Sequence, residues 1–243
     1  MLVLGVESSA KVASCAVCEI DNTGSINSDY QNIKVISNFT ANTGHTHSQT
    51  LLPILEQALN ICGKKFLDMD LISVSSGPGS FTGVRIGVST VKGIAYALKK
   101  PCCGVSSLKA LGLNMLGNAG VVCAVMDARR NQVYNALFRV NGFDFERLCE
   151  DRAISIEDLE TELSGFDEKV YLVGDGADLV KKSISCKNVI LANSFQKLQN
   201  GVSVCAAAIG EKTVSSDMLM PSYLRLSQAE RERINKEKEN LNG

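Results

Sequence analysis

The strongest constraint on the fold is a pattern that occurs twice, roughly 120 residues apart. In each copy an apolar, strand-like run ends in an acidic residue, passes through a short polar stretch and continues into a second apolar run. The first copy is Leu2–Glu7 followed by Val12–Ile20, and the second is Val121–Met126, ending in Asp127, followed by Val133–Val140. A repeat of this length is too long for a solenoid and is typical of a duplicated α/β domain.

The segments between and after these pairs indicate alternating strands and helices. Later in each half a short apolar run meets a glycine turn, Leu71–Ser75 before Gly77 and Val170–Val173 before Gly174. Hydrophobic spacing also predicts a strand at Lys34–Phe39 and helices at Gln49–Cys62 and Phe81–Lys99. We therefore expect a first domain at 1–105, carrying the docking helices discussed below, a second at 106–217, and a C-terminal segment at 218–243 that ends in a solvated, charged tail.

Composition narrows the classes of function. Among 243 residues, 25 are Lys or Arg and 26 are Asp or Glu, so a net charge of −1 creates no general attraction for nucleic acid. The net charge does not address a local basic patch that binds nucleic acid, which stays an open alternative. No apolar run approaches the ~20 residues of a membrane span, and a cytoplasmic protein is expected.

Cysteines and histidines do not form a convincing chemical site. Cys15 and Cys18 have C-x-x-C spacing but lie in a strand-like run, where they should point to opposite faces. The nine cysteines are therefore interpreted as small core residues in a reducing compartment. His45 and His47, the only histidines, are too close together to aim at one ion, and no metal site or Ser-His-Asp set is expected.

A glycine-rich segment at 75–87 reads as a strand, a turn and a helix capped by Ser80. Free backbone N–H groups at such a helix start could hold an anion, although the spacing matches neither standard nucleotide-binding pattern. Glu7 and Asp127 stand at strand ends, where α/β folds place ligand groups, but neither following turn contains glycine, so a working phosphotransferase is hard to build. Arg129 and Arg130 could bind an anion or simply flank a hairpin turn. The candidate anion- or nucleotide-binding residues are Glu7, Gly77, Gly79, Ser80 and Asp127.

Both predicted helices of the first half carry more apolar surface than one buried face needs. This surplus indicates either a helical protein–protein interface or helices enclosed within one domain. Gly83 and Gly87 would let a second helix approach closely. The candidate interface residues are Leu51, Leu52, Leu55, Leu59, Gly83, Arg85, Gly87, Thr90 and Ile94.

Several segments occur in the order expected of one protein family. They are Leu4–Ser9, His47–Pro53, Gly77–Gly87, Met126–Arg130 with Val133 and Tyr134, and Pro221–Arg225. Together they resemble the TsaB family, also called YeaZ, the dimerisation subunits of the bacterial tRNA threonylcarbamoyladenosine system. The resemblance runs from the first strand to Arg225 and does not cover the charged tail.

The resemblance implies an actin-like ASKHA fold, with two duplicated domains that each hold a mixed β-sheet and flanking helices. It implies a non-catalytic subunit that pairs with a catalytic paralogue of TsaD type, joined by an ATPase subunit of TsaE type. That complex transfers threonylcarbamoyl from its adenylate to N6 of adenosine 37 in ANN-decoding tRNAs. ATP and a metal would be used by the partner subunits, this chain would hold no cofactor tightly, and tRNA would be reached through the complex. Partner contacts would lie on residues 50–62 and 81–99.

At two positions this chain differs from the residues usual in the family or in its catalytic paralogue. The family often has Asp-Thr where this chain has Glu7-Ser8, and Lys11 stands where the catalytic paralogue has an acid. Both departures argue against nucleotide chemistry at the first turn. The open alternatives are an ASKHA-type ATPase or transferase that uses Glu7, the Gly77–Ser80 loop and Asp127, and a homodimer formed through the same helices.

Overall fold

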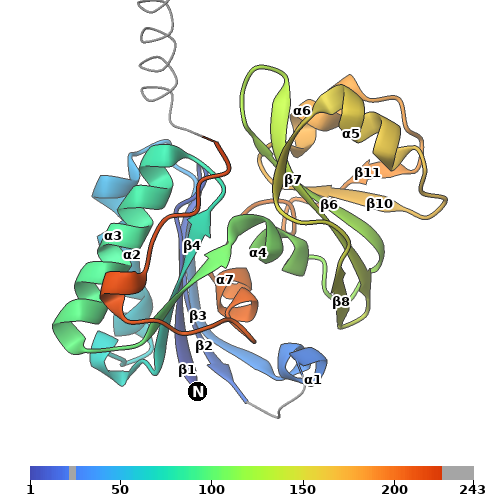
Figure 1. Cartoon of the computed structure of the whole chain (residues 1–243). Coiled ribbons are helices and arrows are strands. Elements are labelled where there is room, and N and C mark those ends of the chain that lie inside the picture. The colour runs from blue at the N-terminus through green and yellow to red at the C-terminus, as the bar shows by residue number, and fades with distance from the viewer. Residues whose placement is uncertain (22–25, 226–243) are drawn as a thin grey trace, which may run out of the picture.

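The computed structural model describes residues 1–21 and 26–225, so the predicted charged tail lies outside the described residues. The first half is built on a five-stranded sheet of order β3-β2-β1-β4-β5 (Figure 1). Its strands are β1 (Leu2–Glu7), β2 (Ala13–Ile20), β3 (Ile33–Ala41), β4 (Leu71–Gly77) and β5 (Cys102–Ser106). The β1–β2 and β2–β3 pairs are antiparallel and the β1–β4 and β4–β5 pairs are parallel, so the sheet is mixed.

The second half repeats this plan. Its sheet has the order β11-β10-β6-β7-β8, with β9 paired to β7 outside that path. The strands are β6 (Ala119–Asp127), β7 (Gln132–Asn141), β8 (Asp144–Arg147), β9 (Arg152–Ser155), β10 (Val170–Val173) and β11 (Val189–Leu191). As in the first sheet, the hairpin strands β6 and β7 are antiparallel, whereas β10 runs parallel to both β6 and β11. The matching order confirms the duplication predicted from the sequence.

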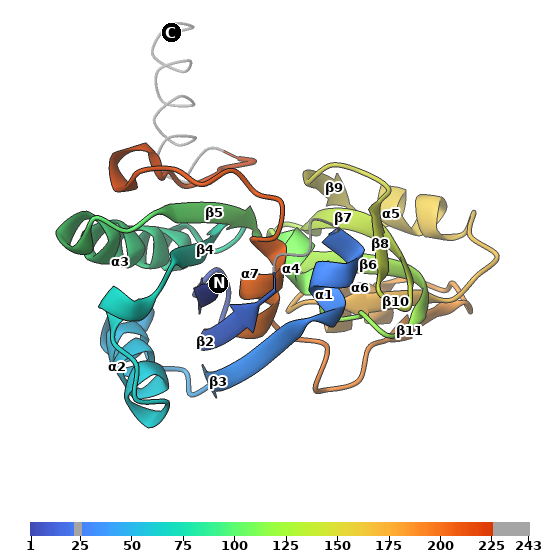
Figure 2. The same ribbon diagram turned by 90° about the horizontal axis from the view of Figure 1, so that it is seen from below.

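Helices cover both sheets. They are α1 (Ile26–Gln31), α2 (His47–Ile61), α3 (Phe81–Leu98), α4 (Ser107–Leu113), α5 (Ile156–Leu163), α6 (Ala177–Ser183) and α7 (Gly201–Ala207), with short 3₁₀ turns η1 (Phe66–Asp68) and η2 (Ser216–Met218). Helices α2 and α3 lie on one face of the first sheet and α7 lies on the other (Figure 2). Helix α4 packs against α7, β6 and β7, and so stands between the halves.

The end of the chain returns to the first half, whereas the boundaries expected from the sequence place 201–217 in the second domain. Helix α7 packs on β1 and β2. The approach is so close that a Cβ on Gly201 would lie 2.5 Å from the backbone nitrogen of Ala16. Beyond α7, Cys102 and Val214 exchange two backbone hydrogen bonds of 3.0 and 2.7 Å. The final described segment therefore runs along the outer edge of the first sheet.

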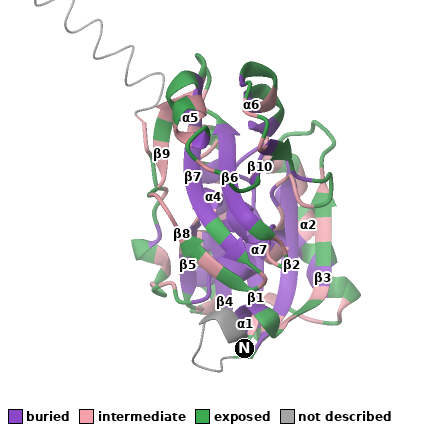
Figure 3. Cartoon of the chain, turned by 90° about the vertical axis from the view of Figure 1, so that its right-hand side faces the viewer, coloured by how far each residue is buried: buried purple, intermediate pink, exposed green. Residues whose placement is uncertain are grey.

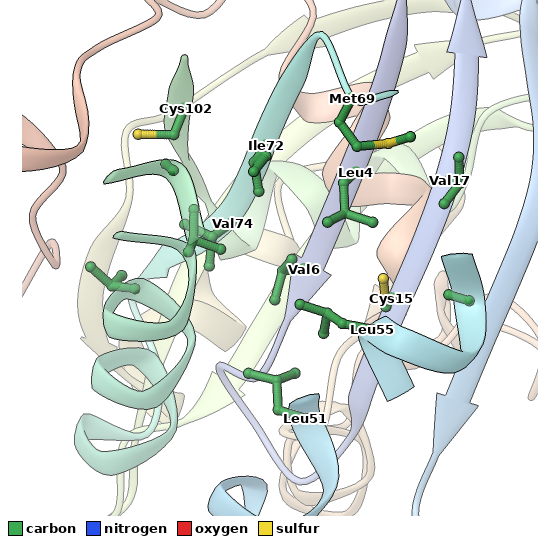
Figure 4. Close-up of a cluster of buried hydrophobic side chains, with 14 of the residues drawn as sticks. Leu4, Val6, Cys15, Val17, Leu51, Leu55, Met69, Ile72, Val74 and Cys102 are labelled. Carbon is green, nitrogen blue, oxygen red and sulfur yellow. The ribbon is translucent and has the colours of Figure 1, made fainter. Parts of the chain in front are cut away.

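The central strands are buried on both faces, as Figure 3 shows by colour. Apolar residues of β1, β2 and β4 form one core with α2 and α3 (Figure 4) and another with α7. Cys15 belongs to the first core and Cys18 to the second, so the prediction that they point to opposite faces is confirmed. All nine cysteines are free thiols.

No helix in the described ranges is long and apolar enough to cross a membrane. Across the same residues, no group of three or more His, Cys, Asp or Glu side chains is placed to hold a metal ion.

Candidate functional site

A cleft of about 590 Å³ lies between the two halves. It is enclosed by the β1–β2 turn, the loop after β4, the start of α3, the β6–β7 turn and the C-terminal segment. The residues that line it are Ser9, Ala10, Lys11, Pro78, Gly79, Ser80, Phe81, Thr82, Val84, Met126, Asp127, Ala128, Arg129, Tyr134, Asp175, Ser222, Tyr223, Leu224 and Arg225. Three predicted anion-site residues, Gly79, Ser80 and Asp127, are thus brought together, whereas Glu7 and Gly77 do not line the cleft.

Glu7 is fully buried at the end of β1, and its own chain engages both carboxylate oxygens. The backbone N–H of Ser9 donates to Oε1 at 2.5 Å, and the Ser75 hydroxyl donates to Oε2. Burial raises the pKa of Glu7, against the lowering effect of these hydrogen bonds. The carboxyl therefore ties the ends of β1 and β4 together, with both oxygens hydrogen-bonded and shielded from solvent.

The glycine loop after β4 is filled by the chain itself. Gly77 has φ +128°, and a Cβ there would lie 2.2 Å from the carbonyl oxygen of Ser222. A Cβ on Gly79 would lie 2.3 Å from the carbonyl oxygen of Ser9, and that oxygen accepts the Ser80 N–H at 2.7 Å. These glycines admit neighbouring backbone, which is the space that a phosphate would need.

The start of α3 is capped as predicted, because the Ser80 hydroxyl accepts the Gly83 N–H at 3.3 Å. Gly83 and Gly87 are the residues predicted to let a second helix approach. Both are buried in the described chain, and Cβ atoms there would lie 2.2 Å from the Ser8 carbonyl oxygen and 2.4 Å from its Oγ. The close approach that the structure shows at these glycines is that of the chain's own Ser8 turn.

The β6–β7 turn contributes an acid and an arginine to the cleft. The Asp127 carboxylate accepts the Arg129 N–H at 2.7 Å. Arg129, Arg130 and Asn131 all have positive φ, of 62°, 55° and 59°, which L-residues rarely adopt and which together reverse the chain. Of the two roles suggested for Arg129 and Arg130, forming the hairpin turn is observed, and Arg129 also lines the cleft.

Asp175 is a cleft residue that sequence reasoning missed. Its carboxylate accepts a hydrogen bond of 3.2 Å from Gln199, and burial raises its pKa. The available signal was its place after β10, in a glycine turn that matches the one after β4.

The C-terminal segment was also missed as part of the site. Tyr223 stacks on Phe81 with ring centroids 5.1 Å apart, and Arg85 donates to the Tyr223 hydroxyl at 2.7 Å. The Arg85 guanidinium lies 3.7 Å above the centre of the Phe81 ring. Ser222 N–H donates to the Ser76 carbonyl at 2.7 Å. We call residues 214–225 the strap, since they run beside α3 and on to the cleft (Figures 1 and 2).

The candidate interface residues on α2 divide into two groups. Leu51, Leu55 and Leu59 are buried in the core beneath the helix, where Figure 4 places Leu51 and Leu55 beside Val6. Leu52 is 46% exposed. The three buried leucines support the interpretation of α2 as partly enclosed within its own domain.

On α3, the candidates Thr90 and Ile94 are half-buried and Arg85 is exposed but held against the strap. His47 at the start of α2 has its Nε2 2.6 Å from the Ala10 carbonyl oxygen, a contact that fixes the β1–β2 turn.

Comparison with known proteins gives consistent matches. The TsaD family model, described as tRNA N6-adenosine threonylcarbamoyltransferase, matches residues 34–241. The tRNA threonylcarbamoyladenosine biosynthesis protein TsaB of Bacillus subtilis is 32% identical over 209 residues, which are 84% of this chain and 90% of the relative. The TsaB protein of Haemophilus influenzae is 26% identical over 194 residues, covering 74% of this chain and 80% of that protein.

Among solved structures, YeaZ from Pseudomonas aeruginosa superposes with a TM-score of 0.74 at 23% identity, over 92% of this chain and 99% of that one. This likeness extends the sequence matches to the whole arrangement of two duplicated halves. The chain therefore belongs to the TsaB (YeaZ) family and has the actin-like, ASKHA-type fold.

Proposed function

We propose that this chain is the non-catalytic dimerisation and activation subunit of a complex that forms threonylcarbamoyladenosine at position 37 of ANN-decoding tRNAs. The observation that carries the proposal is the packing around Glu7 and the glycine loop. Both Glu7 carboxylate oxygens accept hydrogen bonds, from Ser9 and Ser75, and the backbone of Ser222 and Ser9 fills the space beside Gly77 and Gly79. A metal-bound phosphate would have to displace these groups, so the chain is poorly equipped for transfer chemistry of its own.

The chemistry would belong to a TsaD-type paralogue, with a TsaE-type ATPase joining the assembly. In that arrangement ATP and a metal are used by the partner subunits, this chain binds no cofactor tightly, and the complex works in the cytoplasm on tRNA. The match of this chain to the TsaD family model supports pairing between paralogues, because related folds can present similar surfaces to one another.

The docking surface would be the outer side of α3 beside α2. Ile86, Thr90, Ile94 and Ala97 recur at helical spacing and are half-buried or exposed, with exposed Gly93 among them. At the end of α2, Ile61 is 66% exposed. Thr90 and Ile94, two of the predicted interface residues, belong to this uncharged stripe. The stripe takes the place of the buried leucines Leu51, Leu55 and Leu59 in the proposed surface.

A reconstituted modification assay tests the proposal. The paralogue, the ATPase, threonylcarbamoyl-adenylate and tRNA are combined with and without this chain, and modified nucleoside is measured. We expect product only when the chain is present and none from the chain alone. Product from the chain alone, or equal product without it, would refute the proposal.

The docking surface has its own test. Gly93→Arg places a long cation in the stripe where a Cβ meets nothing within 4 Å, so the fold should persist. Lys182→Glu, at an exposed position on α6 in the second half, serves as a charge-changing control. We expect Gly93→Arg to weaken paralogue binding at least tenfold by calorimetry and the control to leave it unchanged. Equal affinities would exclude this surface.

The alternative, a nucleotide-binding enzyme, is favoured only by the size of the cleft. Titration of the isolated chain with ATP and Mg²⁺ separates the two functions. Micromolar binding that Glu7→Gln abolishes would support the enzyme.

A further inference from the structure

Three cations from separate parts of the chain line the cleft. Lys11 comes from the β1–β2 turn, Arg129 from the β6–β7 turn and Arg225 from the strap. The ion pairs found within the described residues use other cations. Arg225 donates one hydrogen bond of 3.2 Å to the Ala128 carbonyl, which places its guanidinium beside the turn that carries Arg129.

The acids in the same cleft are already engaged. Asp127 accepts the Arg129 N–H, and Asp175 accepts a hydrogen bond from Gln199. Burial raises the pKa of Asp175, and the nearby charge of Lys11 lowers it. With Lys11, Arg129 and Arg225 set against Asp127 and Asp175, the cleft lining has one more basic than acidic residue in a chain whose net charge is −1.

Aromatic rings stand among these cations. Phe81, Tyr134 and Tyr223 line the cleft, and Tyr223 is 44% exposed. Phe81 and Tyr223 form a stacked pair with ring planes 30° apart at the start of α3, with Arg85 over the Phe81 ring, so Tyr223 is the exposed member of the pair. Cations that follow a backbone, interleaved with aromatic platforms for bases, are the pattern by which proteins bind unpaired nucleotides.

We propose that the mouth of this cleft, through Lys11, Arg129 and Arg225, binds the phosphate backbone of unpaired nucleotides in the tRNA substrate. The proposal rests on the proposed function, which supplies tRNA as the polyanion. Lys11 and Arg129 are exposed, so their charges are open to the phosphates of a strand at the cleft. A compact triphosphate would instead need the glycine positions, and those are occupied by Ser9 and Ser222.

Fluorescence anisotropy with a labelled anticodon stem-loop RNA tests this site in the full chain and again in the reconstituted complex. The variants are Lys11→Gln and Arg129→Gln, which remove exposed charges and leave the core intact, and Arg225→Gln. The control is Arg139→Gln, which removes the same charge near the far end of β7, where Arg139 is 45% exposed and pairs with Glu146 and Glu168.

We expect each cleft variant to weaken binding roughly threefold to tenfold and to reduce the slope of log affinity against log salt by about 1. Tyr134→Leu should weaken binding at least about fivefold without changing that slope, because it removes stacking and no charge. The control variant should match the unaltered chain.

Several results would overturn the proposal. These are equal weakening by Arg139→Gln, unchanged affinity and salt slope in the cleft variants, absence of RNA binding to both the chain and the complex, and ATP binding that RNA does not displace. This test can fail without refuting the proposed function. If product formation still requires the chain while the cleft variants bind RNA normally, the RNA site alone is wrong.

Discussion

Two glycines of α3 permit a direct test of what that helix contacts. Gly87 and Gly93 lie six positions apart in the same helix, and replacing either with alanine gains the same intrinsic helix preference, about 0.5–1 kcal/mol. At Gly93 a Cβ meets nothing within 4 Å, so Gly93→Ala should raise stability by that amount.

At Gly87 the added methyl would lie 2.4 Å from the Ser8 Oγ and 3.3 Å from a Val74 methyl. Ser8 cannot move freely, because it is fully buried and its hydroxyl donates to the Gly83 carbonyl at 2.9 Å. Displacing that hydroxyl costs about 1–3 kcal/mol for the buried hydrogen bond, with further overpacking against Val74. After subtraction of the helix gain, Gly87→Ala should lower stability by about 1–3 kcal/mol.

The two variants should therefore differ by about 1.5–4 kcal/mol in the free energy of unfolding. In a chain of this length 1 kcal/mol shifts Tm by about 2–4 °C, so calorimetry should separate their melting temperatures by at least about 3 °C. Urea unfolding gives an independent measure. If Gly87→Ala melts with or above Gly93→Ala, the close packing of α3 on the Ser8 turn is wrong, and Gly87 again becomes available to a partner.

Three more perturbations probe the site and the core. Burial raises the pKa of Glu7, so at a pH between its ordinary and its raised pKa the folded chain keeps a proton that the unfolded chain has lost. The free energy of unfolding should therefore fall as pH rises through that range. Glu7→Gln should lessen that decline in Tm measured between pH 4 and 8, and an unchanged profile would contradict the assignment. Arg85→Lys loses the planar stack on Phe81 and should speed hydrogen exchange in the strap at least several-fold, with exchange in β1 as the internal control. A thiol reagent should modify at most the half-buried cysteines of the native chain quickly, and all nine after denaturation; fast reaction of the buried Cys123 would refute this packing. The half-buried thiols are Cys62, Cys149 and Cys186.

Local periodicity predicted much of the fold because the main strands are apolar throughout. Observed β1 and β10 match their predicted bounds, and α3 ends one residue before the expected Lys99. The duplicated order of the two sheets follows from the repeated strand, acid and strand pattern. By contrast, α7 is short and its partners lie nearly 200 residues away in β1 and β2, so no local signal assigns it to the first half.

The candidate site was harder to predict, because its residues act through contacts between distant segments. Glu7 and the glycine loop were correctly singled out as unusual. Their neighbours Ser9, Ser75 and Ser222 are common residues whose importance depends on position alone. The strap belongs to the same class, since the Arg85–Tyr223 contact joins residues 138 positions apart.

The packing that fills the glycine loop also shapes the proposed RNA site. A phosphate-binding loop leaves backbone N–H groups free at the start of its helix. In this chain the Ser80 N–H donates to the Ser9 carbonyl, and Ser222 packs against Gly77. The same packing brings the strap to the cleft, because Ser222 is followed at once by Tyr223, Leu224 and Arg225. Closing the glycine loop and placing a cation at the mouth are therefore two results of one contact. Because of this coupling, a substitution that loosens the strap from Gly77 should reopen the loop and withdraw Arg225 together, so the cleft should lose RNA affinity in the same variant that gains room for a phosphate.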